Sequence, residues 1–308
     1  MNAVSPTKSG LIAPWGALAC AAAAMLFAAK GIFAKKLYTQ GLSFEGVVAI
    51  RAMISLPLFW WFALRRESLS TIATTPPRAI FVAAFAGALC YYAGALLDFL
   101  ALTMIDASIE RVLIFSYPAM VVIFTSARDR RWPERRVLAA TLLAYLGVFF
   151  TMGGFDLAEL RANLLGALLV IGSALSYAVY FMVGETYTRS VGSARFTLIA
   201  MTAATACLVP HYFLIGGLHE MTTIEPPGWW LLIGIAVFCM FLPASFQAEG
   251  VRRIGAERGA VLSSVGPPTT VLLAFTLLDE RLSAWQWAGM ALIVLGILVL
   301  DLARTRKP

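Results

Sequence analysis

Ten long apolar runs divide this chain and limit the folds that are open to it. They cover residues 11–37, 44–64, 79–102, 107–127, 135–153, 163–184, 195–216, 228–250, 256–278 and 284–303. A helix needs about 20 mostly apolar residues to cross a bilayer, and each run is close to that length. The runs are continuous rather than alternating, which argues against strands. The sequence therefore predicts an all-α polytopic membrane protein with ten transmembrane helices.

The composition supports a membrane location. Hydrophobic residues make up 60% of the 308 residues and charged residues 13%, whereas a soluble domain carries about 25% charged residues. The net charge of +7 comes from short basic clusters between the apolar runs, which is a membrane-topology pattern and not a nucleic-acid surface. We expect a lipid bilayer as partner and no nucleic acid. The run from Leu11 is too long for the apolar part of a cleaved signal peptide, about 7–15 residues.

The basic residues are distributed unequally between the connections. The side that holds the termini carries 17 of the 24 Lys and Arg residues, the opposite side carries 6, and Arg51 lies inside a run. Because Lys and Arg concentrate on the cytoplasmic side, both termini are predicted to be cytoplasmic. Lys30, Lys35 and Lys36 oppose this trend. Either the first helix continues past Lys30 or these residues have a function of their own.

The chain repeats itself at a spacing of 149 residues. This shift places "IDASIERVLIFSYP" (105–118) on "IGAERGAVLSSVGP" (254–267) without a gap, so that Pro118 meets Pro267. Between residues 90 and 150, 12 of 61 aligned pairs are identical. Apolar helices match by chance, but here proline, glycine and loop positions coincide as well.

Two five-helix repeats, 11–153 and 160–303, explain this self-similarity. A shift of 150 extends it to the first helix, where Lys30 falls on Tyr180. An odd number of spans makes the second repeat run in the opposite direction through the membrane. Inverted repeats recur in transporters, which hold their substrate near mid-membrane between the halves. The alternative is an old duplication in a membrane protein of another class.

The second repeat carries a recognisable motif in residues 253–300. Pro267 lies at the centre of the ninth run, the turn Asp279-Glu280-Arg281 follows, and the last run contains Gly289 and Gly296. This pattern resembles the second EamA half of the drug/metabolite transporter superfamily. We expect the acidic turn to join helices 9 and 10 on the non-cytoplasmic side, with the tryptophans just after it as interface anchors, Trp285 and Trp287.

The first repeat resembles the same pattern over residues 97–124, with Pro118 at the matching position. Its turn departs from the family, because Arg130-Arg131-Trp132-Pro133 replaces the acidic residues. The resemblance covers the chain from about residue 13 to about residue 302. It implies a ten-helix secondary transporter, often an exporter of metabolites. Within the family the chain resembles the amino-acid exporters of the YddG type.

The family lines its cavity mainly with helices 1, 3, 4, 6, 8 and 9. On these helices the sequence places hydroxyl and aromatic side chains, and four of them, beginning at Ser173, follow i, i+3, i+4, i+7 spacing on one face. Such a wall suits an amphiphile with an apolar part; ordinary helix packing is the alternative. The predicted cavity residues are Tyr91, Ser116, Tyr117, Ser176, Tyr177, Tyr180 and Ser264.

Charged residues inside apolar runs are expensive and must face protein or water. Lys30, Glu110 and Arg111 are candidates for a gate, because Glu110 and Arg111 open the fourth helix and can pair with each other or with Lys30. Arg51 is expected to reach the near interface or to pair with Glu45. At the ends of their helices, two further carboxylates are expected at the interface, Asp98 and Glu249.

Catalytic and metal motifs are absent from the sequence. It contains no GxxxxGK[ST] phosphate loop, no HExxH and no GxSxG. Only two histidines occur, and each of the four cysteines lies inside an apolar run without a CxxC pair. We therefore expect no catalytic residue, no metal and no cofactor.

These observations combine into one expectation for function. The protein is predicted to export small organic metabolites, above all neutral or aromatic amino acids, by alternating access, with Pro118 and Pro267 as bend points. The alternatives are another cargo, such as a nucleoside, a sugar derivative or a cationic drug, or else a polytopic membrane enzyme. The family implies the bacterial inner membrane. Energy coupling and oligomeric state stay open, with a monomer as the simplest state.

Overall fold

A computed structural model describes residues 12–105, 107–151, 164–269, 272 and 283–301, and the secondary structure of these residues is entirely helical. Six helices in this part of the chain are long and apolar enough to cross a membrane. They are Pro14–Tyr38, Phe44–Arg66, Pro77–Ala101, Leu164–Val191, Ser193–Leu214 and Pro226–Ile254. Each coincides closely with one of the predicted runs, and several are built from more than one element.

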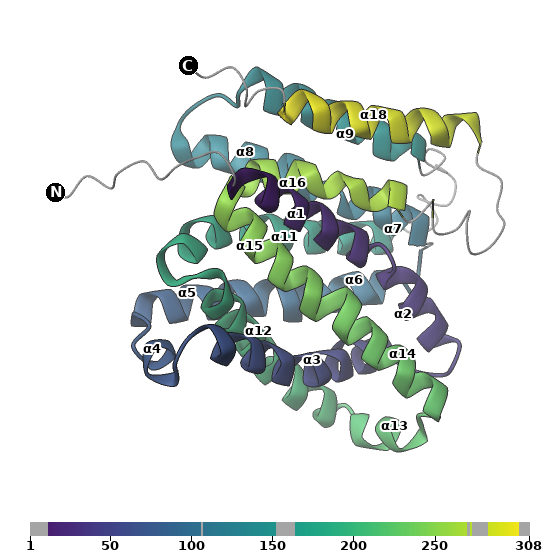
Figure 1. The fold of residues 1–308 in the computed structure, drawn as a ribbon. Helices are drawn as coiled ribbons and strands as arrows, with labels where there is room; N and C mark the ends of the chain where they lie inside the picture. Colours follow the sequence, from purple (N-terminus) through teal and green to yellow (C-terminus); the bar gives the residue numbers. More distant parts are fainter. Residues whose placement is uncertain (1–11, 106, 152–163, 270–271, 273–282, 302–308) are drawn as a thin grey trace.

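The elements of the first half follow the chain order shown in Figure 1. They are α1 (Ile12–Phe27), α2 (Lys30–Tyr38), α3 (Phe44–Arg66), α4 (Leu69–Ala73), α5 (Pro77–Gly87), the π-helical segment η1 (Ala88–Gly94), α6 (Ala95–Ala101), α7 (Ala107–Ile114), α8 (Tyr117–Asp129) and α9 (Arg135–Thr151). The first helix resumes at Lys30 after a break, so the lysines that opposed the charge trend belong to a helix that continues to Tyr38.

The second half contains α11 (Leu164–Val191), α12 (Ser193–Leu214), α13 (Gly217–Thr223), α14 (Pro226–Ala236), the π-helical segment η2 (Val237–Phe241), α15 (Leu242–Ile254), α16 (Ala256–Leu262), the 3₁₀ segment η3 (Ser263–Val265) and α18 (Ala284–Asp301). Helices occupy all or part of every predicted run. The Asp279-Glu280-Arg281 turn lies outside the described residues, while Trp285 and Trp287 are exposed at the start of α18.

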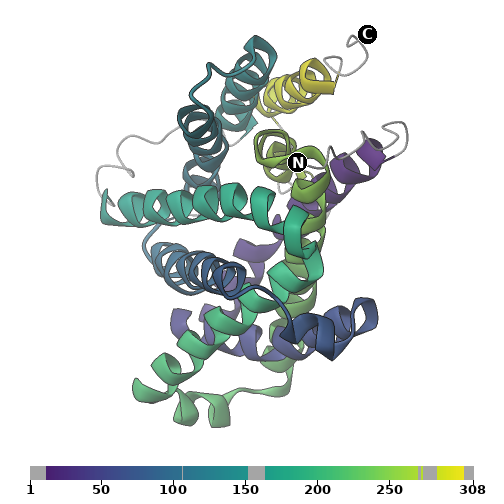
Figure 2. The same ribbon diagram turned by 90° about the vertical axis from the view of Figure 1, so that its left-hand side faces the viewer.

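The helices α9 and α18 form a pair at one edge of the bundle, away from α3 and α12 (Figures 1 and 2). They approach closely because small residues face the contact. A Cβ atom on Gly147 would lie 2.5 Å from Ile293 Cγ1, and one on Gly296 would lie 3.0 Å from the carbonyl oxygen of Ala140. These two glycines are 149 residues apart in the sequence and occupy the two sides of the same contact.

The predicted fourth and ninth helices are interrupted just before their prolines. The run 107–127 is expected to be one helix, but α7 ends at Ile114 and α8 begins at Tyr117. The equivalent point of the second half lies in η3, immediately before Pro267. The reason is the same in both places: proline has no N–H, so the carbonyl four residues earlier loses its helical partner. Both prolines are buried.

The predicted third and eighth helices contain a π-helical segment at matching positions. Residues 88–94 and 237–241 adopt this wider turn, and the 149-residue shift places one on the other. π-Helical turns inside α-helices occur frequently at functional sites. Each segment contains a buried cysteine, Cys90 and Cys239.

Candidate functional site

A cavity lies in the middle of the bundle, among segments from both halves of the chain. Its lining comes from α1, α2, η1, α7 and α8 of the first half, and from α11, α15 and η3 of the second. Counted along the ten predicted runs, these elements belong to helices 1, 3, 4, 6, 8 and 9. The cavity offers about 50 Å³, which is room for a few water molecules and less than the about 300–1,000 Å³ of a typical ligand pocket.

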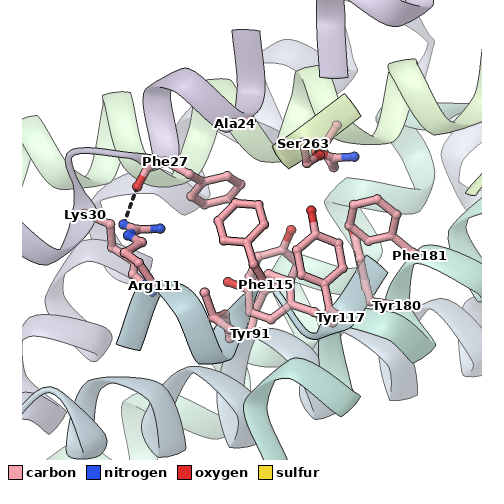
Figure 3. Close-up of a pocket in the computed structure, with 13 residues that line it drawn as sticks. Ala24, Phe27, Lys30, Tyr91, Arg111, Phe115, Tyr117, Tyr180, Phe181 and Ser263 are labelled. Atoms are coloured by element: carbon pink, nitrogen blue, oxygen red, sulfur yellow. Dashed lines mark hydrogen bonds between the residues drawn. The ribbon is translucent and has the colours of Figure 1, made fainter. Parts of the chain in front are cut away.

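Aromatic side chains form one end of this cavity (Figure 3). The ring of Tyr117 lies 5.1 Å from that of Phe181 and 6.1 Å from that of Tyr177. Tyr91 and Tyr180 meet edge to face at 5.0 Å. All four tyrosines were predicted to lie at the site, and the structure brings them together.

Two cations form the other end of the cavity. Lys30 and Arg111 are the charged side chains among the described residues that line it, and both are largely buried. Behind them lie two buried carboxylates: the Lys30 ammonium donates to Asp98 Oδ2 and to Glu110 Oε1, the latter at 3.4 Å. Arg111 Nε lies 3.6 Å from Glu110 Oε2. The structure thus joins the three predicted gate residues into one cluster and adds Asp98.

Arg111 also caps the break in the first helix. Its Nη2 donates to the carbonyl oxygen of Phe27 at 2.7 Å (Figure 3) and to that of Ala28 at 3.4 Å. Carbonyls at a helix end have no partner within the helix and need one in a membrane. The guanidinium therefore ties α7 to the break between α1 and α2 at the charged end.

The expected interface positions of Asp98 and Arg51 are wrong. Asp98 has only 1% of its surface exposed and is paired with Lys30. Arg51 is buried with its guanidinium 4.3 Å above the ring of Phe99, and its Nε has no hydrogen-bond partner among the described residues. It does not pair with Glu45. The missed signal was depth. Lys30 and Asp98 fall in the second half of Pro14–Tyr38 and Pro77–Ala101, and Arg51 lies in the first half of Phe44–Arg66, the helix between them in the chain.

Neutral polar groups lie near the aromatic end. Gln247 and Ser263 line the cavity there, and the Ser263 hydroxyl lies 3.4 Å from Gln247 Oε1. Gln247 Nε2 lies 3.8 Å from the sulfur of Cys20. The sequence alone did not select Gln247 or Phe181, because one amide or one phenyl ring in an apolar run carries no distinct signal.

Three predicted serines do not reach the central cavity. Ser116 and Ser264 line a separate, mostly apolar cavity of about 290 Å³ beside α9. Ser176 donates its hydroxyl to the carbonyl of Ser173 at 2.7 Å and lies where a Cβ atom on Gly94 would be. Its role here is close packing between α11 and η1, as the helix-packing alternative anticipated.

Ion pairs join several elements at the end of the bundle where α8 and α15 finish and α16 begins. Arg128 on α8 lies 3.5 Å from Glu185 on α11, and Arg131 lies 3.8 Å from Glu257 on α16. Burial of these groups is partial, so each pair alone contributes little, on the order of 0–1 kcal/mol. At the end of α15, Glu249 pairs with Arg252 and Arg253 at 2.6 and 2.5 Å.

A bundle of long apolar helices around an internal cavity that contains buried charges is the architecture of a membrane transport protein. The sequence profile described as the EamA-like transporter family matches residues 14–153 and again residues 164–301. The chain therefore belongs to this family, and it is a multi-pass membrane transporter and not an enzyme. A small-molecule substrate and a lipid environment follow from that membership.

Individual relatives agree with the family. The chain is 31% identical to "Uncharacterized transporter YcbK" of Bacillus subtilis over 85% of both chains. It is 25% identical to "Threonine/homoserine exporter RhtA" of Salmonella typhimurium over 69% of this chain and 68% of that protein. A solved structure described as "Crystal structure of protein" has a TM-score of 0.78 at 18% identity, covering 94% of this chain and 98% of that one. That likeness concerns the fold alone.

Proposed function

We propose that this transporter exports small organic metabolites, and neutral or aromatic amino acids in particular, by alternating access through the central cavity. The observation that carries the proposal is the polarity of the cavity, with tyrosine and phenylalanine rings at one end and two cations at the other. An amino acid with an apolar side chain matches this arrangement, because it too has an apolar part at one end and charged groups at the other. RhtA, a relative named as a threonine and homoserine exporter, supports this substrate class.

Two matched halves support the alternating-access part of the proposal. The family profile matches the chain twice, and the interruptions before Pro118 and Pro267 lie at equivalent points, as do η1 and η2. Two similar halves of opposite orientation would give inward-open and outward-open states of similar energy, so a modest binding energy shifts the population. The small cavity fits a closed state, and a cargo enters when the halves move apart.

The orientation belongs to the same proposal. The excess of Lys and Arg on the side of the termini, 17 against 6, favours cytoplasmic termini in a bacterial inner membrane. Its consequence is that the Lys30 cluster lies toward the non-cytoplasmic face and the Arg128 to Glu185 contact toward the cytoplasm.

Counterflow in proteoliposomes tests the proposal. Vesicles containing the purified protein and unlabelled phenylalanine should accumulate labelled phenylalanine transiently from outside, because exchange requires only a binding site that is exposed alternately. Tyr117→Ala should reduce the rate by removing a ring from the aromatic end, whereas Trp230→Ala, on an exposed face of α14, should not. A competition screen with threonine, a nucleoside, a sugar derivative and a cationic drug covers the other cargoes. If no amino acid exchanges or competes, amino-acid export is wrong.

A further inference from the structure

The charged end of the cavity contains more buried positive than negative charge. In their ionised forms Lys30, Arg111 and Arg51 outnumber the two carboxylates, Asp98 and Glu110, and each of the five residues has at most 6% of its surface exposed. Around them lie titratable groups that are neutral in their common forms: Tyr38, Tyr177, Cys90 and Cys239. A buried surplus charge is costly unless a counter-ion or a polar partner meets it.

The surplus faces the cavity. Lys30 and Arg111 line it (Figure 3). Asp98 and Glu110 contact these cations but are not among the lining residues, and the described part of the lining has no carboxylate. A cargo at this end therefore meets two cations first and has no acidic side chain of the lining to receive an ammonium group. An anionic group is the chemistry that this end can bind.

Geometry favours a carboxylate as that group. Two of the hydrogen bonds that Arg111 donates go to neutral carbonyl oxygens, so the guanidinium is held in place by backbone. A planar guanidinium matches a carboxylate, and hydrogen bonds between the two charged groups are among the stronger ones in proteins. The ammonium of Lys30 adds a second positive charge beside it.

We infer that Lys30 and Arg111 form a carboxylate subsite, and that the carboxylate of the cargo, rather than its ammonium group, is the group the transporter requires. This inference rests on the proposed function and narrows it. The cargo class becomes small apolar carboxylates, with amino acids as one case. Deaminated acids of the same shape bind comparably, and amides that retain the ammonium bind poorly.

Three related compounds separate the two charged groups of an amino acid. Phenylalanine has both, phenyllactate keeps the carboxylate and lacks the ammonium, and phenylalaninamide keeps the ammonium and lacks the carboxylate. In the counterflow assay phenyllactate should compete within a fewfold of phenylalanine. Phenylalaninamide should need about a tenfold or higher concentration, since a hydrogen bond between charged groups typically contributes that much to affinity. Equal competition by phenylalaninamide overturns the inference.

Variants assign the effect to the subsite. Arg111→Gln should weaken phenyllactate about tenfold or more and leave phenylalaninamide unchanged, while Arg111→Lys should restore part of the loss. Arg195→Gln is the matched control, because Arg195 is a partly buried arginine paired with Glu67 at 2.5 Å outside the cavity lining. The double variant Lys30→Gln with Glu110→Gln removes one charge of each sign and should also weaken phenyllactate. An unchanged preference in Arg111→Gln and in the double variant overturns the assignment.

Direct binding keeps this test separate from the test of transport. Labelled phenyllactate should bind the purified wild-type protein in detergent and should bind Arg111→Gln about tenfold more weakly, whether or not flux is observed. Binding without counterflow contradicts the proposed function and supports the subsite. Counterflow of phenylalanine together with no binding of phenyllactate supports transport and overturns the subsite.

Discussion

The two halves of the chain share a framework but differ in charge where they meet the cavity. The 149-residue shift places Asp98 on Gln247, Glu110 on Gly259 and Arg111 on Ala260. The first-half residues form a buried ionic cluster, whereas Gln247 lies beside Ser263 and Cys20. The breaks, the π-helical turns and the glycine contacts recur in both halves.

This comparison shows that the two halves can share their backbone geometry while their buried charges differ. The breaks depend on proline and therefore recur with it. Buried charges depend on one another, because removing one partner leaves the other uncompensated in a medium of low dielectric. One end of the cavity is consequently ionic and the other neutral. Two halves with identical side chains would give a cavity with equal ends, whereas the ends of this cavity differ chemically.

The largest expected effect comes from removing the central cation of the ionic end. Lys30→Met leaves Asp98 and Glu110 buried without the ammonium that contacts both. We expect a loss of about 3–5 kcal/mol of stability, seen as a large drop in the thermal unfolding midpoint in detergent. Adding Asp98→Asn to Lys30→Met should recover part of it. An unchanged midpoint in the single variant would show that the cluster is not electrostatically coupled.

The converse substitution places a charge at the neutral end. Gln247→Asp puts a carboxylate at the position equivalent to Asp98. Among the described residues, no cation makes a hydrogen bond with Gln247. The expected cost is about 2–4 kcal/mol, since the carboxyl must be protonated or left unpaired. Gln247→Leu, which is close in size and uncharged, is the control and should cost less. If both substitutions lower the midpoint equally, packing and not charge sets the difference between the ends.

A smaller effect is expected where the halves contact each other through equivalent glycines. A Cβ atom on Gly147 would lie 2.7 Å from the carbonyl oxygen of Gly289, backbone that cannot move aside easily, whereas the nearest atom to a Cβ on Gly296 is at 3.0 Å. Gly147→Ala should therefore cost about 1–3 kcal/mol, and Gly296→Ala less. Thermal unfolding of the two variants side by side checks this order, and the reverse order would contradict the contact.

The smallest effect is expected at the second-half residue that the 150-residue shift places opposite Lys30. The hydroxyl of Tyr180 is buried and makes no hydrogen bond of good geometry among the described residues, although the hydroxyls of Tyr91 and Thr197 lie near it, so Tyr180→Phe removes a poorly satisfied polar atom. Stability should change by less than about 0.5 kcal/mol or rise slightly. A clear loss of stability, measured beside Lys30→Met, would mean that the hydroxyl has a partner such as water in the cavity.

Much of the cavity's aromatic end could be predicted from the sequence, and the serines show where prediction failed. The spacing of Tyr177 and Tyr180 on one face of α11 was enough to place both at the cavity. Ser176 was predicted with them because it belongs to the same i, i+3, i+4, i+7 set. Successive residues on a helix point about 100° apart, so Ser176 points to Gly94 instead. The residue spacing identifies one face of the helix, but how many residues of that face reach the cavity depends on how the neighbouring helix packs against it.

The sequence by itself determined the membrane class, the apolar runs and the two proline bend points, Pro118 and Pro267, because length, hydropathy and proline act locally and do not depend on distant residues. Only the tertiary structure decided which charges are partners. Lys30, Asp98 and Glu110 lie on three different helices, and 68 and 80 residues separate Lys30 from the other two. Whether a charge inside a membrane reaches the interface or pairs in the interior depends on what the adjacent helix presents, and packing alone brings those helices together.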